Sequence, residues 1–104
     1  MSEQITYAAS GTTAANTEID LSGVITDPMD TRGSNDPIES AVLVDFTAGD
    51  GTDLTSLGQG AVGDPAAGEI VVVSDTSIAL GDAVDTADQV VITYEDSGEG
   101  GIKS

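Results

Sequence analysis

The sequence contains no cysteine, no histidine and no tryptophan in its 104 residues. Without cysteine there are no disulfides and no thiolate nucleophile, and zinc sites built from cysteine and histidine are excluded. Without histidine, the most common general acid–base group is missing, and the many serines and threonines have no histidine to activate them. We therefore expect a protein that is not an enzyme.

Positive charge is almost absent. Arg32 and Lys103 stand against 19 acidic residues, which gives a net charge of -17. Such self-repulsion destabilises a compact state in dilute buffer, but at molar salt the screening length shrinks to about 3 Å. The composition therefore indicates a protein that works in concentrated salt. It also excludes a basic patch for phosphates, so we expect no nucleic-acid partner.

Long apolar runs are missing as well. No stretch approaches the ~20 apolar residues of a membrane helix, so no membrane partner is expected. The first ten residues, MSEQITYAAS, lack the basic and apolar segments of a secretory signal. We expect the chain to be made in the cytoplasm of a high-salt host.

The sequence does contain short apolar segments with the alternation of half-buried strands. A hydrophobic share of 38% argues against global disorder, and no amphipathic helix is evident. Glycine, proline and aspartate separate the segments, which is typical of an all-β fold. We predict a small single-domain β-sandwich or barrel of five to seven strands with a flexible N-terminal arm. The predicted strands are 17–25, 41–47, 69–74 and 89–95, with a weaker one at 77–80, and 69–74 is expected to be covered on both faces.

Domain boundaries follow from composition. Residues 1–16 are predicted to be an N-terminal arm or a short strand, with Ile5 and Tyr7 on one face. Residues 17–96 form the β-domain, and the glycine-rich residues 97–104 form a flexible C-terminal tail. The N-terminal residues either fray or add a strand to the sheet edge of a neighbouring molecule.

The segments between the strands are mostly predicted loops. Asp36, Pro37 and Glu39 have the N-cap, N1 and N3 types that open a helix, so one helical turn is predicted there. A turn is expected over 48–53 and a loop over 58–68. The glycines at 58–63 fit G-x-G-x-x-G, but Asp-Pro follows instead of a helix, so phosphate binding is not expected.

One loop is a candidate metal site. Asp45, Asp50 and Asp53 lie close together in the sequence, and hard cations such as Ca²⁺ or Mg²⁺ prefer oxygen ligands. The spacing does not match an EF-hand, and the alternative is a hairpin turn shaped by aspartate and glycine. Residues 27–30 are a weaker candidate, and no other cofactor is expected. Arg32 is expected to pair with a loop aspartate of its own chain or with an acidic neighbouring subunit.

Three segments carry a family resemblance: GEIVVV at 68–73, IALGDAV at 78–84 and QVVITYE at 89–95. Together they resemble the C-terminal β-hairpin of small β-rich structural proteins of tailed viruses, with a G-x-I-x-V strand, a GD turn and a terminal V-x-V-x-Y strand. Residues 85–88 are additional to that pattern. The resemblance covers 68–96 and implies no catalytic or binding residues.

With the acidic composition, the resemblance implies a virion protein of a haloarchaeal tailed virus. The expected role is capsid decoration through symmetric protein–protein contacts. A tail or head–tail connector protein is one alternative, and a cellular halophilic binding module, with or without Ca²⁺, is another. The expected partners are the chain itself, as a homo-oligomer, and a major capsid or tail protein. The predicted contact residues are Ile5, Tyr7, Val71, Val73 and Val91.

Overall fold

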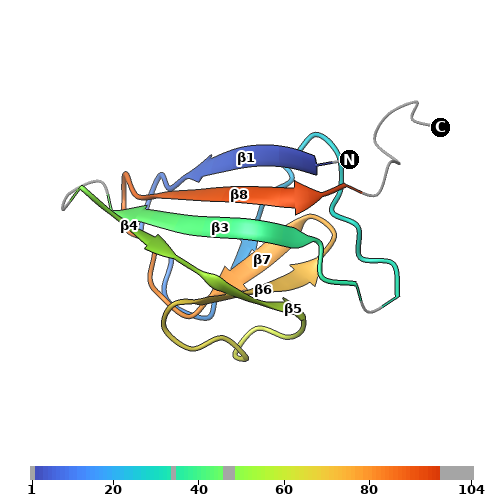
Figure 1. Cartoon of the computed structure of the whole chain (residues 1–104). Helices are drawn as coiled ribbons and strands as arrows, with labels where there is room; N and C mark the ends of the chain where they lie inside the picture. The colour runs from blue at the N-terminus through green and yellow to red at the C-terminus, as the bar shows by residue number, and fades with distance from the viewer. Residues whose placement is uncertain (1, 34, 46–48, 97–104) are drawn as a thin grey trace.

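The fold consists of two β-sheets packed face to face (Figure 1). The computed structural model describes residues 2–33, 35–45 and 49–96, and the regular elements in this part of the chain are all strands. The predicted all-β class is therefore confirmed. The strands are β1 (Ser2–Ala8), β2 (Glu18–Asp20), β3 (Ile38–Asp45), β4 (Asp50–Asp53), β5 (Thr55–Gln59), β6 (Glu69–Ser74), β7 (Ser77–Leu80) and β8 (Gln89–Glu95).

Sheet 1 has the order β1-β8-β3-β4 and is antiparallel throughout. The last strand of the chain, β8, lies between the first strand and β3, as Figure 1 shows. Ile92 is opposite Ile5 on one side and Ala41 on the other. Because side chains alternate between faces, this register gathers the apolar residues of three strands on one face.

Sheet 2 has the order β2-β7-β6-β5. The pairs β2–β7 and β6–β7 are antiparallel, whereas β5 runs parallel to β6. A parallel neighbour needs a crossover rather than a tight hairpin, and the loop 60–68 makes that connection.

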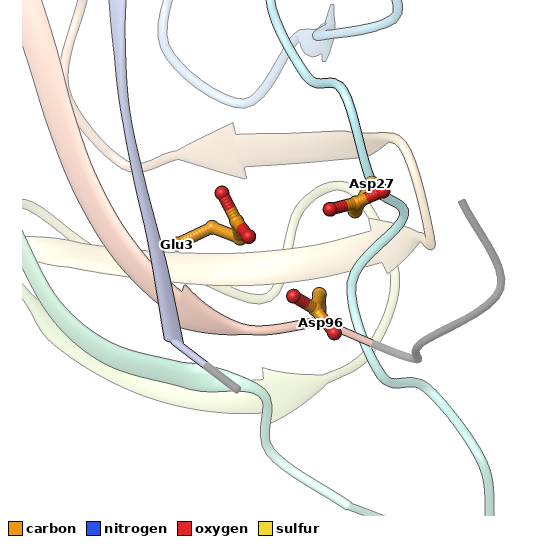
Figure 2. Close-up of side chains that lie close together, drawn as sticks. All are labelled: Glu3, Asp27 and Asp96. Atoms are coloured by element: carbon orange, nitrogen blue, oxygen red, sulfur yellow. The ribbon is translucent and has the colours of Figure 1, made fainter. Parts of the chain in front are cut away.

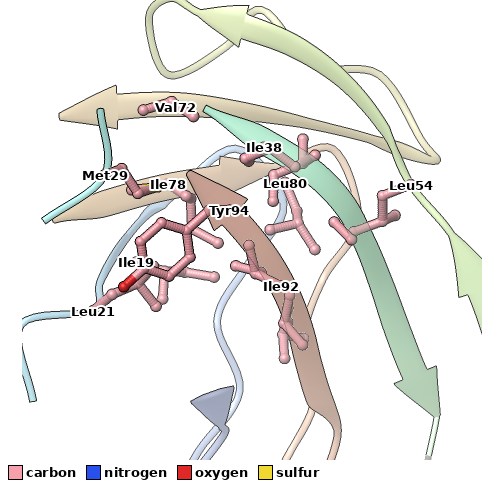
Figure 3. Close-up of a cluster of buried hydrophobic side chains, with 14 of the residues drawn as sticks. Ile19, Leu21, Met29, Ile38, Leu54, Val72, Ile78, Leu80, Ile92 and Tyr94 are labelled. Atoms are coloured by element: carbon pink, nitrogen blue, oxygen red, sulfur yellow. The ribbon is translucent and has the colours of Figure 1, made fainter. Parts of the chain in front are cut away.

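The main core lies between the two sheets (Figure 3). On β8 the side chains of Val90, Ile92 and Tyr94 are fully buried, while the residues between them are half-buried. The strand predicted over 89–95 is therefore confirmed, and its alternating apolar residues face the core. Burial of these aliphatic side chains, at about 25 cal/mol per Å² of apolar surface, supplies most of the drive to fold. The core also includes Ile19, Leu21, Met29, Ile38, Leu54, Ile70, Val72, Ile78, Leu80 and Val84.

A smaller buried layer lies on the outer side of sheet 2. Val71 and Ala79 face each other across β6 and β7 and are 1% and 0% exposed, although neither belongs to the main core. A Cβ at Gly81 would overlap the backbone of Ala66, so the loop 60–68 lies directly on this side of the sheet. The prediction that 69–74 is covered on both faces is confirmed over Ile70–Val72.

Carboxylates hold this loop in place. Gly68 N donates to Asp82 Oδ2 at 2.7 Å, and Ala66 N donates to Glu69 Oε1 at 2.8 Å. Ala61 N donates to Asp64 Oδ2 at 2.9 Å. Some of the acidic residues therefore have a local structural role, because they accept backbone hydrogen bonds that the loop cannot make itself.

Several local predictions differ from the structure. The described chain has eight strands where five to seven were expected, and the loop predicted over 58–68 begins inside β5. The helical turn at Asp36 is wrong: Asp36 Oδ1 accepts a hydrogen bond from Ile38 N at 3.1 Å, but the chain continues directly into β3. The strand predicted over 17–25 ends at Asp20, because Ser22 N bonds to Asp20 Oδ1 and the next residues form a turn. The turn predicted over 48–53 contains β4, which pairs with β3.

The N-terminal segment is a strand and not a free arm. Ser2–Ala8 pairs with β8 along its whole length, and Ile5 and Tyr7 pack partly against the core. Of the two interpretations of residues 1–16, the strand is present over 2–8, followed by a connection that bridges Thr13 to Val84. The predicted tail, 97–104, lies outside the described residues.

Candidate functional site

Three carboxylates meet at one end of the sandwich (Figure 2). Glu3, Asp27 and Asp96 each offer an oxygen, and these oxygens lie within 4.8 Å of one another. Asp27 and Asp96 are only 7% and 4% exposed, and Glu3 is half-buried. Among the described residues, this is the one group of three acidic side chains close enough to share a cation.

Strand pairing assembles this cluster from distant parts of the sequence. The β1–β8 register places Glu3 opposite Tyr94, next to the end of β8 where Asp96 follows. An isolated bridge between Met29 and Asp96 brings in the segment that carries Asp27. Backbone pairing therefore determines the position of all three carboxylates.

Tyr94 connects the cluster to the core. Its ring is fully buried, and its hydroxyl donates a 2.6 Å hydrogen bond to the backbone carbonyl of Asp27. Burial raises the pKa of Tyr94 to about 12, and the negative charges of Glu3, Asp27 and Asp96 add to that rise. The phenol therefore remains a neutral donor beside the carboxylates.

The chemistry of this cluster suits a hard cation. Ca²⁺ takes about 6–8 oxygen ligands and Mg²⁺ about six, so three carboxylates would need water or carbonyl oxygens to complete the shell. Like charges this close also repel each other strongly where water is excluded. Glu3, Asp27 and Asp96 are thus the residues that could hold a metal.

The structure does not bring the predicted metal ligands to one site. Asp45 and Asp50 are directly opposite each other across β3 and β4, but Asp53 is opposite Val42. Because neighbouring positions on a strand face opposite ways, Asp53 points to the other side of the sheet from Asp45 and Asp50. The three residues are exposed parts of a hairpin, which corrects the expectation of a single metal-binding loop.

Arg32 pairs within its own chain. Its Nε and Nη2 donate to the two oxygens of Asp30 at 2.8 and 2.9 Å. The side-chain hydrogen bond from Arg32 lowers the pKa of Asp30 to about 2. This confirms the expected pair with a loop aspartate, and it fixes the segment next to Met29.

The outer face of sheet 1, turned away from the core, carries no charge at its centre. Thr6, Val91 and Val42 form one row across β1, β8 and β3, as the strand registers require. Acidic residues of the described chain lie at its rim, where Asp53 and Glu95 are joined by Glu39, whose Oε2 accepts a hydrogen bond from Ser2 Oγ at 2.7 Å. In a chain with 19 acidic residues, such a neutral surface is a candidate contact face. Its central residues are Gln4, Thr6, Ala8, Ser40, Val42, Val44, Gln89, Val91 and Thr93.

The five predicted contact residues lie in three different places. Val91 is half-buried at the centre of the outer face of sheet 1. Ile5 and Tyr7 are half-buried on the inner side of β1. Val73 is half-buried on β6. Val71 is 1% exposed beneath the loop 60–68, so it cannot contact a partner.

Of the weaker metal candidate at 27–30, Asp27 belongs to the carboxylate cluster, whereas Asp30 pairs with Arg32. Sequence reasoning missed Glu3 and Asp96, because nothing in the sequence links them to Asp27. It also missed the neutral face, for which a signal does exist. The alternate positions 4, 6 and 8 and 89, 91 and 93 carry no acid, although acids are frequent elsewhere. Uncharged residues at every second position of these two strands therefore indicate the neutral outer face of sheet 1.

Comparisons with protein-family models, curated proteins and solved structures found no match. Over the described residues there is also no helix that is long and apolar enough to cross a membrane.

Proposed function

We propose that this protein is a structural component of the virion of a haloarchaeal tailed virus, with capsid decoration as its role. The observation that carries the proposal is the neutral outer face of sheet 1 on a chain with a net charge of -17. Interface centres are depleted of charged residues, and valine, threonine and glutamine side chains can pack there without leaving a buried charge unpaired.

The remaining surface suits the outside of a particle in brine. Most of the acidic residues lie in the loops and in the short edge strands β2 and β4, where concentrated salt screens their repulsion. A decoration subunit works by repeated weak contacts, and symmetry-related copies supply the total strength. In this proposal the neutral face binds the major capsid protein and the acidic surface stays in solvent. A tail or head–tail connector role would use the same chemistry with fewer copies.

Particles that lack this protein allow a direct binding test. Wild-type chain added in molar KCl should sediment with them, and the double variant Val42→Glu/Val91→Glu should not, because it places carboxylates at the centre of the neutral face. Leu57→Glu is the matched control: Leu57 is 42% exposed on β5, away from that face. Equal binding by the double variant and the wild type would overturn the proposed face.

A second candidate is a cellular halophilic module in which Glu3, Asp27 and Asp96 would hold Ca²⁺. Such a module would show a saturable rise in melting temperature with CaCl₂ at constant ionic strength, beyond any general effect of salt. Asp96→Asn should abolish that rise, and Asp53→Asn, on the exposed hairpin, should leave it unchanged. A rise that is the same in both variants would count against a bound cation at the cluster.

A further inference from the structure

Strand β1 is a long open edge of sheet 1. Its seven residues, Ser2–Ala8, pair with β8 on one side, and within the described chain no strand lies on the other. An edge of this kind presents unpaired N–H and C=O groups, which are a template for pairing with another chain.

Two of the other sheet edges are short and acidic. β2 has three residues, and Glu18 and Asp20 flank Ile19. β4 has four residues and begins and ends with Asp50 and Asp53. Short strands with charged side chains are the usual protection against edge-to-edge pairing, since a second copy would bring like charges together.

The fourth edge, β5, is covered by its own chain. Gln59 Nε2 donates to the carbonyls of Thr31, Gly33 and Asn35 at 3.0, 3.2 and 2.7 Å. Ser56 Oγ donates to Asp36 Oδ1 at 2.9 Å, which holds the end of the same segment against β5. Thus three edges are protected, whereas the residues that the structure describes leave β1 uncovered.

We propose that two copies of this chain pair through β1, antiparallel, about a two-fold axis at Ile5. The result is a continuous eight-stranded sheet with the order β4-β3-β8-β1-β1-β8-β3-β4. The inference rests on the edge of this strand alone and holds whether or not the chain belongs to a virus particle.

The register follows from backbone alternation. Ala9 N donates to Asp88 O at 3.0 Å in continuation of the β1–β8 register. Alternate residues bond to the same side, so Ile5 and Tyr7 direct their backbone groups toward β8, and Gln4 and Thr6 direct theirs outward. In the dimer, residues whose backbone groups point away from β8 must pair with residues of the same kind in the second copy. These residues have even numbers, so the two-fold axis must pass through a residue and not between two residues. The axis at Ile5 pairs all seven residues, whereas an axis at Gln4 or Thr6 pairs fewer.

This register also places compatible side chains opposite each other. Ile5 meets Ile5 of the second copy, and the apolar row of Ala41, Ile92 and Ile5 continues from one core to the other. Glu3, the one acid of β1, lies opposite Tyr7 of the second copy and not opposite a carboxylate. The two Glu3 residues are four positions apart along the strand, or about 13 Å. The half-exposed Ile5 and Tyr7 gain cover, and the neutral outer face doubles in width.

Single cysteines test the register, because the chain has none of its own. In the proposed dimer, Ile5 forms a non-hydrogen-bonded pair, whose close Cβ atoms suit a disulfide. Ile5→Cys should therefore form a covalent dimer under mild oxidation in molar KCl, and Gln4→Cys should not. Thr52→Cys, on the β4 edge, is the control for random collision. Cross-linking of Thr52→Cys or Gln4→Cys in preference to Ile5→Cys would overturn the proposal.

A proline variant tests the same edge without oxidation. Thr6→Pro removes an outward N–H, and edge strands tolerate proline where no ladder bond is lost. Light scattering of purified wild-type chain in molar KCl should give twice the monomer mass, and Thr6→Pro should give the monomer mass with an unchanged circular dichroism spectrum. A wild-type monomer at all accessible concentrations, or a folded Thr6→Pro that remains a dimer, would overturn the pairing.

Discussion

The hydroxyl of Tyr94 donates a 2.6 Å hydrogen bond to the backbone carbonyl of Asp27, which lies 67 positions earlier in the chain. The bond ties the end of β8 to the connection between β2 and β3, at the place where Glu3, Asp27 and Asp96 meet. It therefore joins the hydrophobic core to the most acidic part of the interior.

Tyr94→Phe should destabilise the fold by about 1–3 kcal/mol, because the buried carbonyl of Asp27 loses its donor. Denaturant unfolding in molar KCl, followed by circular dichroism, measures the change. Tyr7→Phe is the matched control on the half-buried β1 and should change stability by less than about 0.5 kcal/mol. Equal stability of the two variants would show that the Tyr94 bond contributes nothing.

Alkaline pH should weaken the fold through the same residue. The pKa of Tyr94 is raised from 10.0 to about 12, first by burial and then by nearby carboxylates. Folding therefore favours the protonated phenol. Its contribution is complete below the unfolded pKa of 10 and is lost as pH rises toward 12. The free energy of unfolding should fall more steeply over this window for wild type than for Tyr94→Phe, and parallel curves would contradict the assignment.

Gly81→Ala should destabilise the loop 60–68, because the added Cβ would overlap the backbone of Ala66. Forcing atoms into a packed site costs about 1–3 kcal/mol. Gly11→Ala is the control, since a Cβ there meets nothing within 4 Å. Thermal melting of the two variants measures the difference. A Gly81→Ala variant that melts with the wild type would show that the loop does not rest on the sheet.

Salt should stabilise the protein more than it stabilises one of balanced charge. The screening length falls from about 10 Å at 0.1 M salt to about 3 Å at 1 M, so the self-repulsion of a net charge of -17 declines over this range. The free energy of unfolding should rise with KCl concentration. Asp50→Asn/Asp53→Asn, which removes two exposed charges from β4, should reduce the slope. A stability independent of KCl would contradict the halophilic interpretation.

The sequence predicts the fold best where local pattern and tertiary packing agree. On β8 the alternation of Val90, Ile92 and Tyr94 corresponds directly to burial, and no other element needs to be known. By contrast, β4 reads Asp50-Gly51-Thr52-Asp53, with all four side chains exposed. Its extended state comes from pairing with β3, so its own residues carry little strand signal.

The candidate sites depend on contacts that no local pattern encodes. Glu3 reaches Asp96 through the β1–β8 register, and Asp27 joins them through the bridge between Met29 and Asp96. The predicted metal ligands Asp45 and Asp53 show the converse case. These residues are close in sequence, but a strand turns their side chains to different faces.

The copy number of this protein in purified virus particles tests the central claim most directly. Quantitative mass spectrometry against the major shell protein measures it in particles from the natural source. The account predicts about one copy per shell protein, as symmetric decoration of the whole shell requires. A few copies per particle would instead assign the protein to the tail or neck, and its absence from particles would contradict the virion role.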